Sequence, residues 1–183
     1  GAKFEDQFVG HVEGKQFRWM EGRIERHKSR VGVQGDLKTT VVFSGCFLTI
    51  EVLTPFQNPV RVAQKKPTNW AAYDVDVDIL SKPVGIDDDD FSSMFEIHAF
   101  DQGEAVKLLT PDFRSFLLNL AKRYEDGRLT AAFAEGEFHL AIETEEDLMV
   151  HFDGGKPTNK IQDIVAGLLR DIHAVHALAA SVP

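Results

Sequence analysis

The sequence predicts an α+β domain: a curved, mainly antiparallel sheet of about six or seven strands with one mid-chain helix and a long C-terminal helix packed on it. Three observations support this fold class. Short turns separate successive β-rich stretches, and strands joined by short turns pair antiparallel. A capped helical pattern at residues 111–124 interrupts the strands, and an apolar helical stripe starts near residue 158.

The first part of the chain has the pattern of β-structure. Residues 7–27 form two stretches around Glu13-Gly14, where the glycine supplies the positive φ of a tight hairpin. Residues 39–53 are rich in β-branched and aromatic side chains, which predicts one long strand. Gly45 lies inside this strand and indicates a bulge or a bend.

Shorter strands are expected at residues 60–64, 73–80 and 94–100. In the second of these, three aspartates alternate with apolar residues. Same-face residues on a strand lie ~6.6 Å apart, too far for these side chains alone to chelate one ion, so a solvated acidic face is expected. Residues 87–90, four consecutive aspartates, predict a loop or the start of a short helical turn rather than a calcium loop.

The helix at residues 111–124 is the clearest element. Thr110 is a good N-cap and Pro111 stands at the first helical position, where its missing N–H costs nothing. A hairpin around Glu135-Gly136 follows, and then the long helix. We expect one domain over residues 1–183, and a pleckstrin-homology-like barrel closed by the last helix is one topology that fits this order.

Composition excludes several functions. The net charge of −9 argues against nucleic acid, and against direct binding to an anionic membrane. Cys46 is the only cysteine, so an internal disulfide and a thiolate metal cluster are excluded. Its apolar surroundings predict an inert packing residue. No nucleotide-binding motif, serine-hydrolase elbow or membrane-spanning segment is recognisable, and His173 and His176 are too few for a metal site. No cofactor is expected.

Four polar residues near the mid-chain helix are candidates for a site: His98, Asp101, Gln102 and Glu104. One interpretation is structural, with the three residues after the strand forming a turn. Another is a binding or catalytic site in which His98 acts as a general base oriented by a carboxylate. Trp70 follows two lysines in a loop, so it is either a lid on the core or a contact for a partner.

The chain resembles a bacterial family of domains of unknown function, numbered 3137. The resemblance rests on "FEIHAFDQGEAVKLLTPDF" and "LTAAFAEGEFHLAI" from Met94 onward, and on "VGHVEGKQFRWMEGRIE" and "TTVVFSGCFLTIEV" before it. It implies a domain whose relatives typically carry membrane spans ahead of it. By resemblance we expect a soluble domain at the cytoplasmic face of the membrane, held there by an anchor outside these residues. The resemblance implies no catalytic residues.

We therefore weigh three functions. The first is a non-enzymatic module that binds a protein or peptide through a sheet edge or a groove between sheet and helix. The second is a hydrolase that uses His98 with Asp101 or Glu104. The third is a sensor of a small ligand. A deep pocket in which the histidine and a carboxylate converge would favour the enzyme, and a filled core would favour the interaction module.

Overall fold

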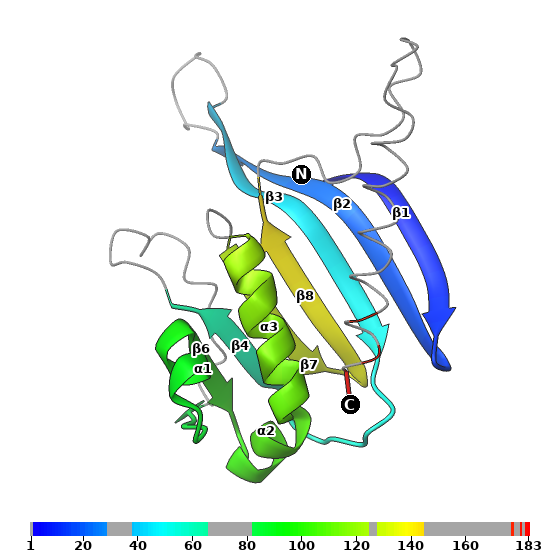
Figure 1. Cartoon of the computed structure of the whole chain (residues 1–183). Coiled ribbons are helices and arrows are strands. Elements are labelled where there is room, and N and C mark those ends of the chain that lie inside the picture. Colours follow the sequence, from blue (N-terminus) through cyan, green and yellow to red (C-terminus); the bar gives the residue numbers. More distant parts are fainter. Residues whose placement is uncertain are drawn as a thin grey trace.

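The computed structural model describes residues 2–28, 38–65, 82–124 and 128–144, together with residues 177, 180, 182 and 183. Within these residues, one eight-stranded sheet has the order β1-β2-β3-β8-β7-β4-β6-β5, and all of its pairs are antiparallel (Figure 1). The strands are β1 Ala2–Val12, β2 Lys15–Lys28, β3 Lys38–Glu51, β4 Val60–Gln64, β5 Lys82–Pro83, β6 Phe95–Ala99, β7 Arg128–Ala134 and β8 Glu137–Glu143. The helices are α1 Asp89–Met94, α2 Gln102–Leu108 and α3 Pro111–Arg123.

Both predicted hairpin turns are confirmed. Glu13 and Gly14 have φ values of 49° and 80°, and Glu135 and Gly136 have φ values of 54° and 81°. Positive φ at both central residues is the geometry of a type I′ turn, whose twist matches that of the flanking strands. The turns therefore fix the registers of the β1–β2 and β7–β8 pairs.

Gly45 marks a close approach between β3 and β8. It pairs with Glu143 and has a φ of 152°, and a Cβ atom on it would lie 2.0 Å from the Ile142 carbonyl oxygen. The irregularity between β2 and β3 lies three residues away, at Val42, between the pair of Ile24 with Phe43 and the pair of Glu25 with Val41, so the predicted bulge is near Gly45 and not at it. Glycine is thus required at position 45 because no side chain fits there.

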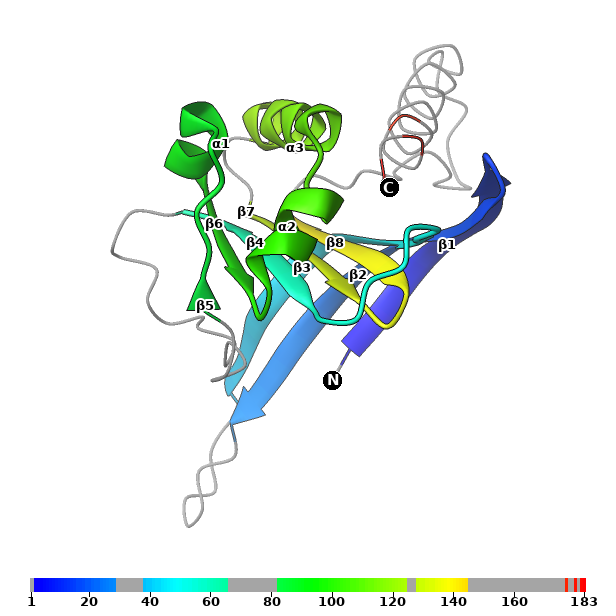
Figure 2. The same ribbon diagram turned by 90° about the horizontal axis from the view of Figure 1, so that it is seen from below.

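The core lies between the sheet and the helices. Figures 1 and 2 show α1, α2 and α3 on one face of the sheet. On β3, β7 and β8, alternate residues are buried against this layer, as expected for a sheet with one covered face. At its centre, the ring of Phe113 on α3 lies 5.6 Å from that of Phe133 and 5.1 Å from that of Phe138. Cys46 is buried in this core, as predicted.

Several details of the predicted fold need correction. The described sheet has eight strands rather than six or seven, partly because β5 has only two residues and leaves no periodic signal. It is an open sheet rather than a pleckstrin-homology-like barrel, because β1 and β5 are its two edges and do not pair with each other. The predicted strand at 73–80 and the long helix from 158 lie outside the described residues.

The middle of the chain also differs from expectation, since the described residues there form α1, α2 and α3 rather than one helix, with α1 following the aspartates for which a short helical turn was one of the two predictions. Asp88 begins α1 by accepting a hydrogen bond from the Phe91 N–H, and Arg114 of α3 donates to its other carboxylate oxygen at 2.7 Å. These two donors lower the pKa of Asp88, with the Phe91 amide contributing most. A cap and an ion pair therefore stabilise a helix too short to show a periodic pattern.

The cap of α3 allows a direct test. The Thr110 hydroxyl oxygen accepts from the Phe113 N–H at 3.3 Å, and Pro111 follows it. We expect Thr110→Ala to lower the free energy of unfolding by about 1 kcal/mol, because one helix N–H loses its acceptor. Chemical denaturation measures this. Ser115→Ala, at an exposed position of the same helix, is the control and should change stability by less than about 0.5 kcal/mol. Equal effects of the two substitutions would contradict the cap.

Candidate functional site

His98 lies on β6 and does not form the predicted pair with Asp101 or Glu104. Its Nε2 atom is 2.9 Å from the Glu96 carboxylate, and its Nδ1 atom is buried without a hydrogen-bond partner. The carboxylate that orients the ring is therefore two residues earlier on the same strand. The sequence did not single out Glu96. Glu96 and His98 lie two residues apart on one face of a strand, and this spacing is equally typical of two side chains that only contact solvent.

Asp101 and Gln102 form the start of α2 rather than a turn. The Asp101 carboxylate accepts from the Glu104 N–H at 2.9 Å, which is the standard N-cap interaction. Gln102 donates from its side-chain amide to the Gly85 carbonyl at 3.1 Å. The first residue thus fixes where the helix begins, and the second fastens it to the segment between β5 and α1.

Glu104 joins α2 to the connection between β3 and β4. Its carboxylate accepts three hydrogen bonds, from the Gln57 N–H at 2.7 Å, the Asn58 N–H at 3.1 Å and the Asn58 side-chain amide at 2.9 Å. The Gln57 amide and then the Asn58 side chain lower the pKa of Glu104. A carboxylate held in this way is a poor base, because protonation would sacrifice these bonds. Trp70, the remaining candidate, lies outside the described residues.

This arrangement predicts a dependence of stability on pH. Because the pKa of Glu104 is lowered on folding, its contribution is present above its ordinary value of 4.5 and is lost as the pH falls through the folded-state pKa. Glu104→Gln should be less stable than the wild type at about pH 7, and the difference should shrink toward about pH 3. Denaturation at both pH values measures it. Glu135→Gln, in an exposed turn, should show no such convergence, and a constant Glu104→Gln difference would refute the prediction.

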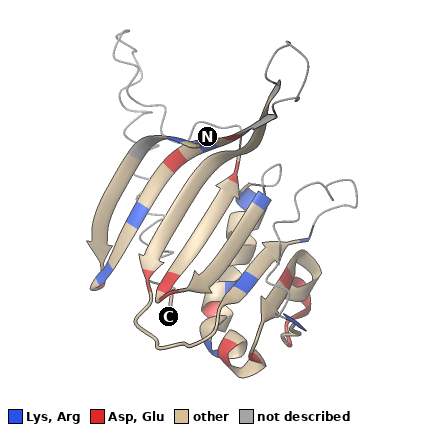
Figure 3. Ribbon diagram, turned by 180° about the vertical axis from the view of Figure 1, so that it is seen from behind, with Lys and Arg blue, Asp and Glu red and all other residues tan. Residues whose placement is uncertain are grey.

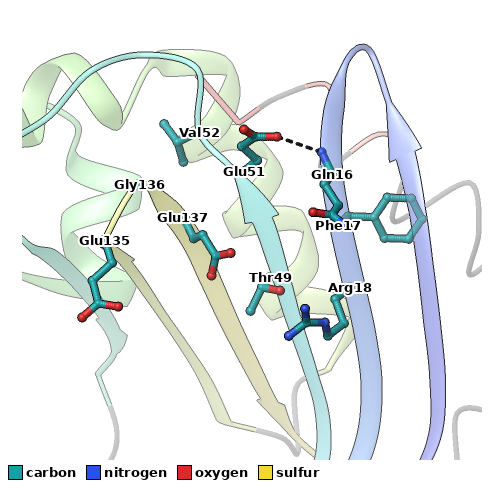
Figure 4. Close-up of a pocket in the computed structure, with 9 residues that line it drawn as sticks. All are labelled: Gln16, Phe17, Arg18, Thr49, Glu51, Val52, Glu135, Gly136 and Glu137. Carbon is teal, nitrogen blue, oxygen red and sulfur yellow. Dashed lines mark hydrogen bonds between the residues drawn. The ribbon is translucent and has the colours of Figure 1, made fainter.

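A polar pocket of about 400 Å³ lies elsewhere, where the ends of β2 and β3 meet the β7–β8 turn (Figure 4). Arg18, Thr49, Glu51 and Glu137 contribute side chains to it, and Glu51 accepts a hydrogen bond from the Gln16 N–H at 3.3 Å. None of the candidate residues named from the sequence lines this pocket. Its walls come from β2, β3 and the β7–β8 turn, and the turn follows β3 by more than 80 residues, so only the sheet register brings these segments together. Within the described part of the chain, no group of three His, Cys, Asp or Glu residues could hold a metal ion.

The two edges of the sheet differ sharply. The edge strand β5 has two residues, one of them Pro83, and short strands with proline discourage further pairing. The edge strand β1 has eleven residues without proline, and in the described structure its only neighbour is β2. Phe4, Phe8 and Val9 on it are 56%, 45% and 56% exposed. Lys3, Glu5 and Asp6 lie near the start of this strand, but its regular part, residues 7–12, carries no charged Lys, Arg, Asp or Glu and is a template for pairing with another strand.

The charges on the sheet reinforce this contrast. Figure 3 shows the face opposite the helices, where Lys, Arg, Asp and Glu are scattered over several strands. Residues 7–12 of β1 include none of these four types. Sequence reasoning recognised the hairpin here but not its edge position, since strand order depends on contacts far apart in the chain.

Comparisons with known proteins add a family and a distant structural similarity. No curated protein matches the sequence significantly. The solved structure described as "crystal structure of the mycobacterial trehalose monomycolate transport factor A, TtfA" aligns with a TM-score of 0.48 and 8% identity, over 98% of this chain and 74% of that chain. Among the described helices, none combines the length and the apolar character needed to cross a bilayer.

The sequence profile described as "Protein of unknown function (DUF3137)" matches residues 41–180. This match spans most of the chain and includes the motifs at residues 95–113 and 129–142, whereas the opening hairpin at residues 9–25, on which the resemblance also rested, lies outside it. The chain therefore belongs to the DUF3137 family of proteins of unknown function.

Proposed function

We propose that this protein is a non-enzymatic interaction module that binds an extended segment of a protein or peptide along the β1 edge. The observation that carries the proposal is the exposed, eleven-residue edge strand with large apolar side chains and no proline. Addition of a strand to such an edge is a common mode of peptide recognition, in which main-chain hydrogen bonds supply affinity and side chains supply specificity.

The backbone groups available on β1 follow from its register. Val12 pairs with Lys15 across the two-residue turn, so these two residues exchange both main-chain hydrogen bonds. Alternate residues of an antiparallel strand point their N–H and C=O groups in opposite directions. Gln7, Val9 and His11 consequently direct these groups away from β2, toward the position of an added strand.

The other functions weighed from the sequence have less support. The hydrolase weighed from the sequence would use His98 with Asp101 or Glu104, whereas His98 contacts Glu96 instead, and Glu104 accepts hydrogen bonds from the Gln57 and Asn58 amides. Neither His98 nor Glu96 lines the pocket described above. A small-ligand sensor could use the pocket between β2, β3 and the β7–β8 turn, but that pocket is lined largely by exposed polar side chains. Buried, mostly apolar walls are typical of small-molecule sites.

Display at the cytoplasmic face of a bacterial membrane is also part of the proposal. It rests on the resemblance to the family, which implies membrane spans ahead of this domain. The anchor would lie outside these residues, and the net charge of −9 would keep the domain away from anionic lipid.

Selection from a library of displayed peptides tests edge binding. We expect the selected peptides to be extended and rich in β-branched residues, and Val9→Pro to weaken their binding at least tenfold, because one outward N–H is lost and the edge is blocked. Val106→Lys, which changes a similarly exposed valine on α2, is the control. If the proline variant remains folded by circular dichroism and binds the peptides as tightly as the wild type, edge binding is wrong.

A further inference from the structure

The β1 edge is complementary to itself. We infer that a second copy of this chain occupies it, through antiparallel β1–β1 pairing about a two-fold axis at Val9. The inference rests on the proposed function, because it names the partner strand of the same edge. Such pairing would join two open sheets into one continuous sheet across the dimer.

The register is set by the backbone groups that point away from β2. With the two-fold axis at Val9, this residue faces Val9 of the second copy, and Gln7 faces His11. All three outward-directed residues of the regular segment then lie in hydrogen-bonded pairs, which gives roughly six inter-chain bonds. A shift by one pair in either direction would bring the irregularity between Phe4 and Gln7, or the hairpin turn, into the ladder.

The side chains fit the same register. Phe8 falls opposite Gly10 of the second copy in a non-hydrogen-bonded pair, where side chains approach most closely. The ring of Phe17 from β2 already covers Gly10, because a Cβ atom on Gly10 would be 2.7 Å from the Phe17 ring. Figure 4 shows the Phe17 ring directed toward β1. The pairing therefore places an aromatic ring from each copy beside a second one, which is a favourable cross-strand contact.

Local charge permits a second copy at this edge. The chain carries −9 overall, so two copies repel each other at long range, but residues 7–12 place no charged Lys, Arg, Asp or Glu at the line of contact. The same neutrality removes like-charge repulsion between two β1 strands at the line of contact. Since one strand pair is a small contact, the expected dimer is weak and depends on protein concentration.

Charge exchange at the two-fold position tests the pairing. We expect sedimentation of the wild type to show dimers that increase with concentration, and Val9→Lys and Val9→Glu each to weaken association at least tenfold, because like charges would face each other. An equimolar mixture of the two variants should recover dimers, since the charges are then opposite. Val106→Lys and Val106→Glu, alone or mixed, should leave the wild-type dimer unchanged.

The outcomes separate this inference from the proposed function. A wild type that stays monomeric while Val9→Pro abolishes peptide binding overturns self-pairing and leaves edge binding intact. If the wild type is monomeric and the selected peptides bind Val9→Pro as tightly as the wild type, both self-pairing and edge binding are wrong. Dimers that survive in Val9→Lys alone, or a mixture that fails to recover them, place the contact elsewhere and overturn the inference.

Discussion

Phe133→Ala should lower the free energy of unfolding by about 3–5 kcal/mol, the typical cost of removing a buried phenylalanine ring. Phe133 is fully buried on β7, which lies in the middle of the sheet between β8 and β4. Its ring centroid is 5.0 Å from that of Phe138, 5.6 Å from that of Phe113 and 6.2 Å from that of Phe56. Truncation would leave a cavity beneath α3 that rigid strands on both sides cannot close.

Urea denaturation followed by circular dichroism measures this loss. Phe100→Ala is the matched control, because Phe100 follows β6 and is 43% exposed. It should change the free energy of unfolding by less than about 0.5 kcal/mol. If Phe133→Ala cost no more than the control, the aromatic cluster would not be the centre of the core.

Gly45→Ala should destabilise the protein by at least about 2 kcal/mol, since two effects act together. The new methyl group would lie 2.0 Å from the Ile142 carbonyl oxygen, and a φ of 152° is unfavourable for any residue with a Cβ atom. The clash involves main-chain atoms rather than a flexible side chain. Relief therefore requires β3 and β8 to separate where their pairing begins.

Gly85→Ala is the control for this substitution. A Cβ atom on Gly85 would meet nothing within 4 Å, and this residue has no positive φ. It should change stability by less than about 0.5 kcal/mol. Thermal or chemical unfolding of both variants decides the question, and equal stability would show that β3 and β8 do not approach as closely as described.

The parts of the fold predictable from sequence are those determined by local chemistry. Both hairpin turns contain Glu-Gly, whose glycine accepts positive φ, and α3 has a cap, a proline and an apolar stripe in order. Helix α2 was missed because Gly103 stands at its second position and the helix is only seven residues long. In so short a segment, Asp101-Gln102-Gly103 has the composition of a turn as much as of a helix start.

Strand order could not be predicted, since it depends on contacts between distant segments. In the described sheet β3 pairs with β8 rather than with β4, and β1 lies at an edge because it pairs only with β2. The partners of Glu104 could not be predicted for the same reason, because Gln57 and Asn58 precede it by 47 and 46 residues. Local pattern identified the polar residues, and long-range packing decided what they contact.

The most direct measurement for the central claim is amide hydrogen exchange along β1 with and without a bound partner strand. The account predicts new protection at Gln7, Val9 and His11, whose N–H groups face the open edge, and little change at Phe8 and Gly10, which already bond to β2. Unchanged exchange at these three amides, or new protection only on another strand or helix, would contradict binding at the β1 edge.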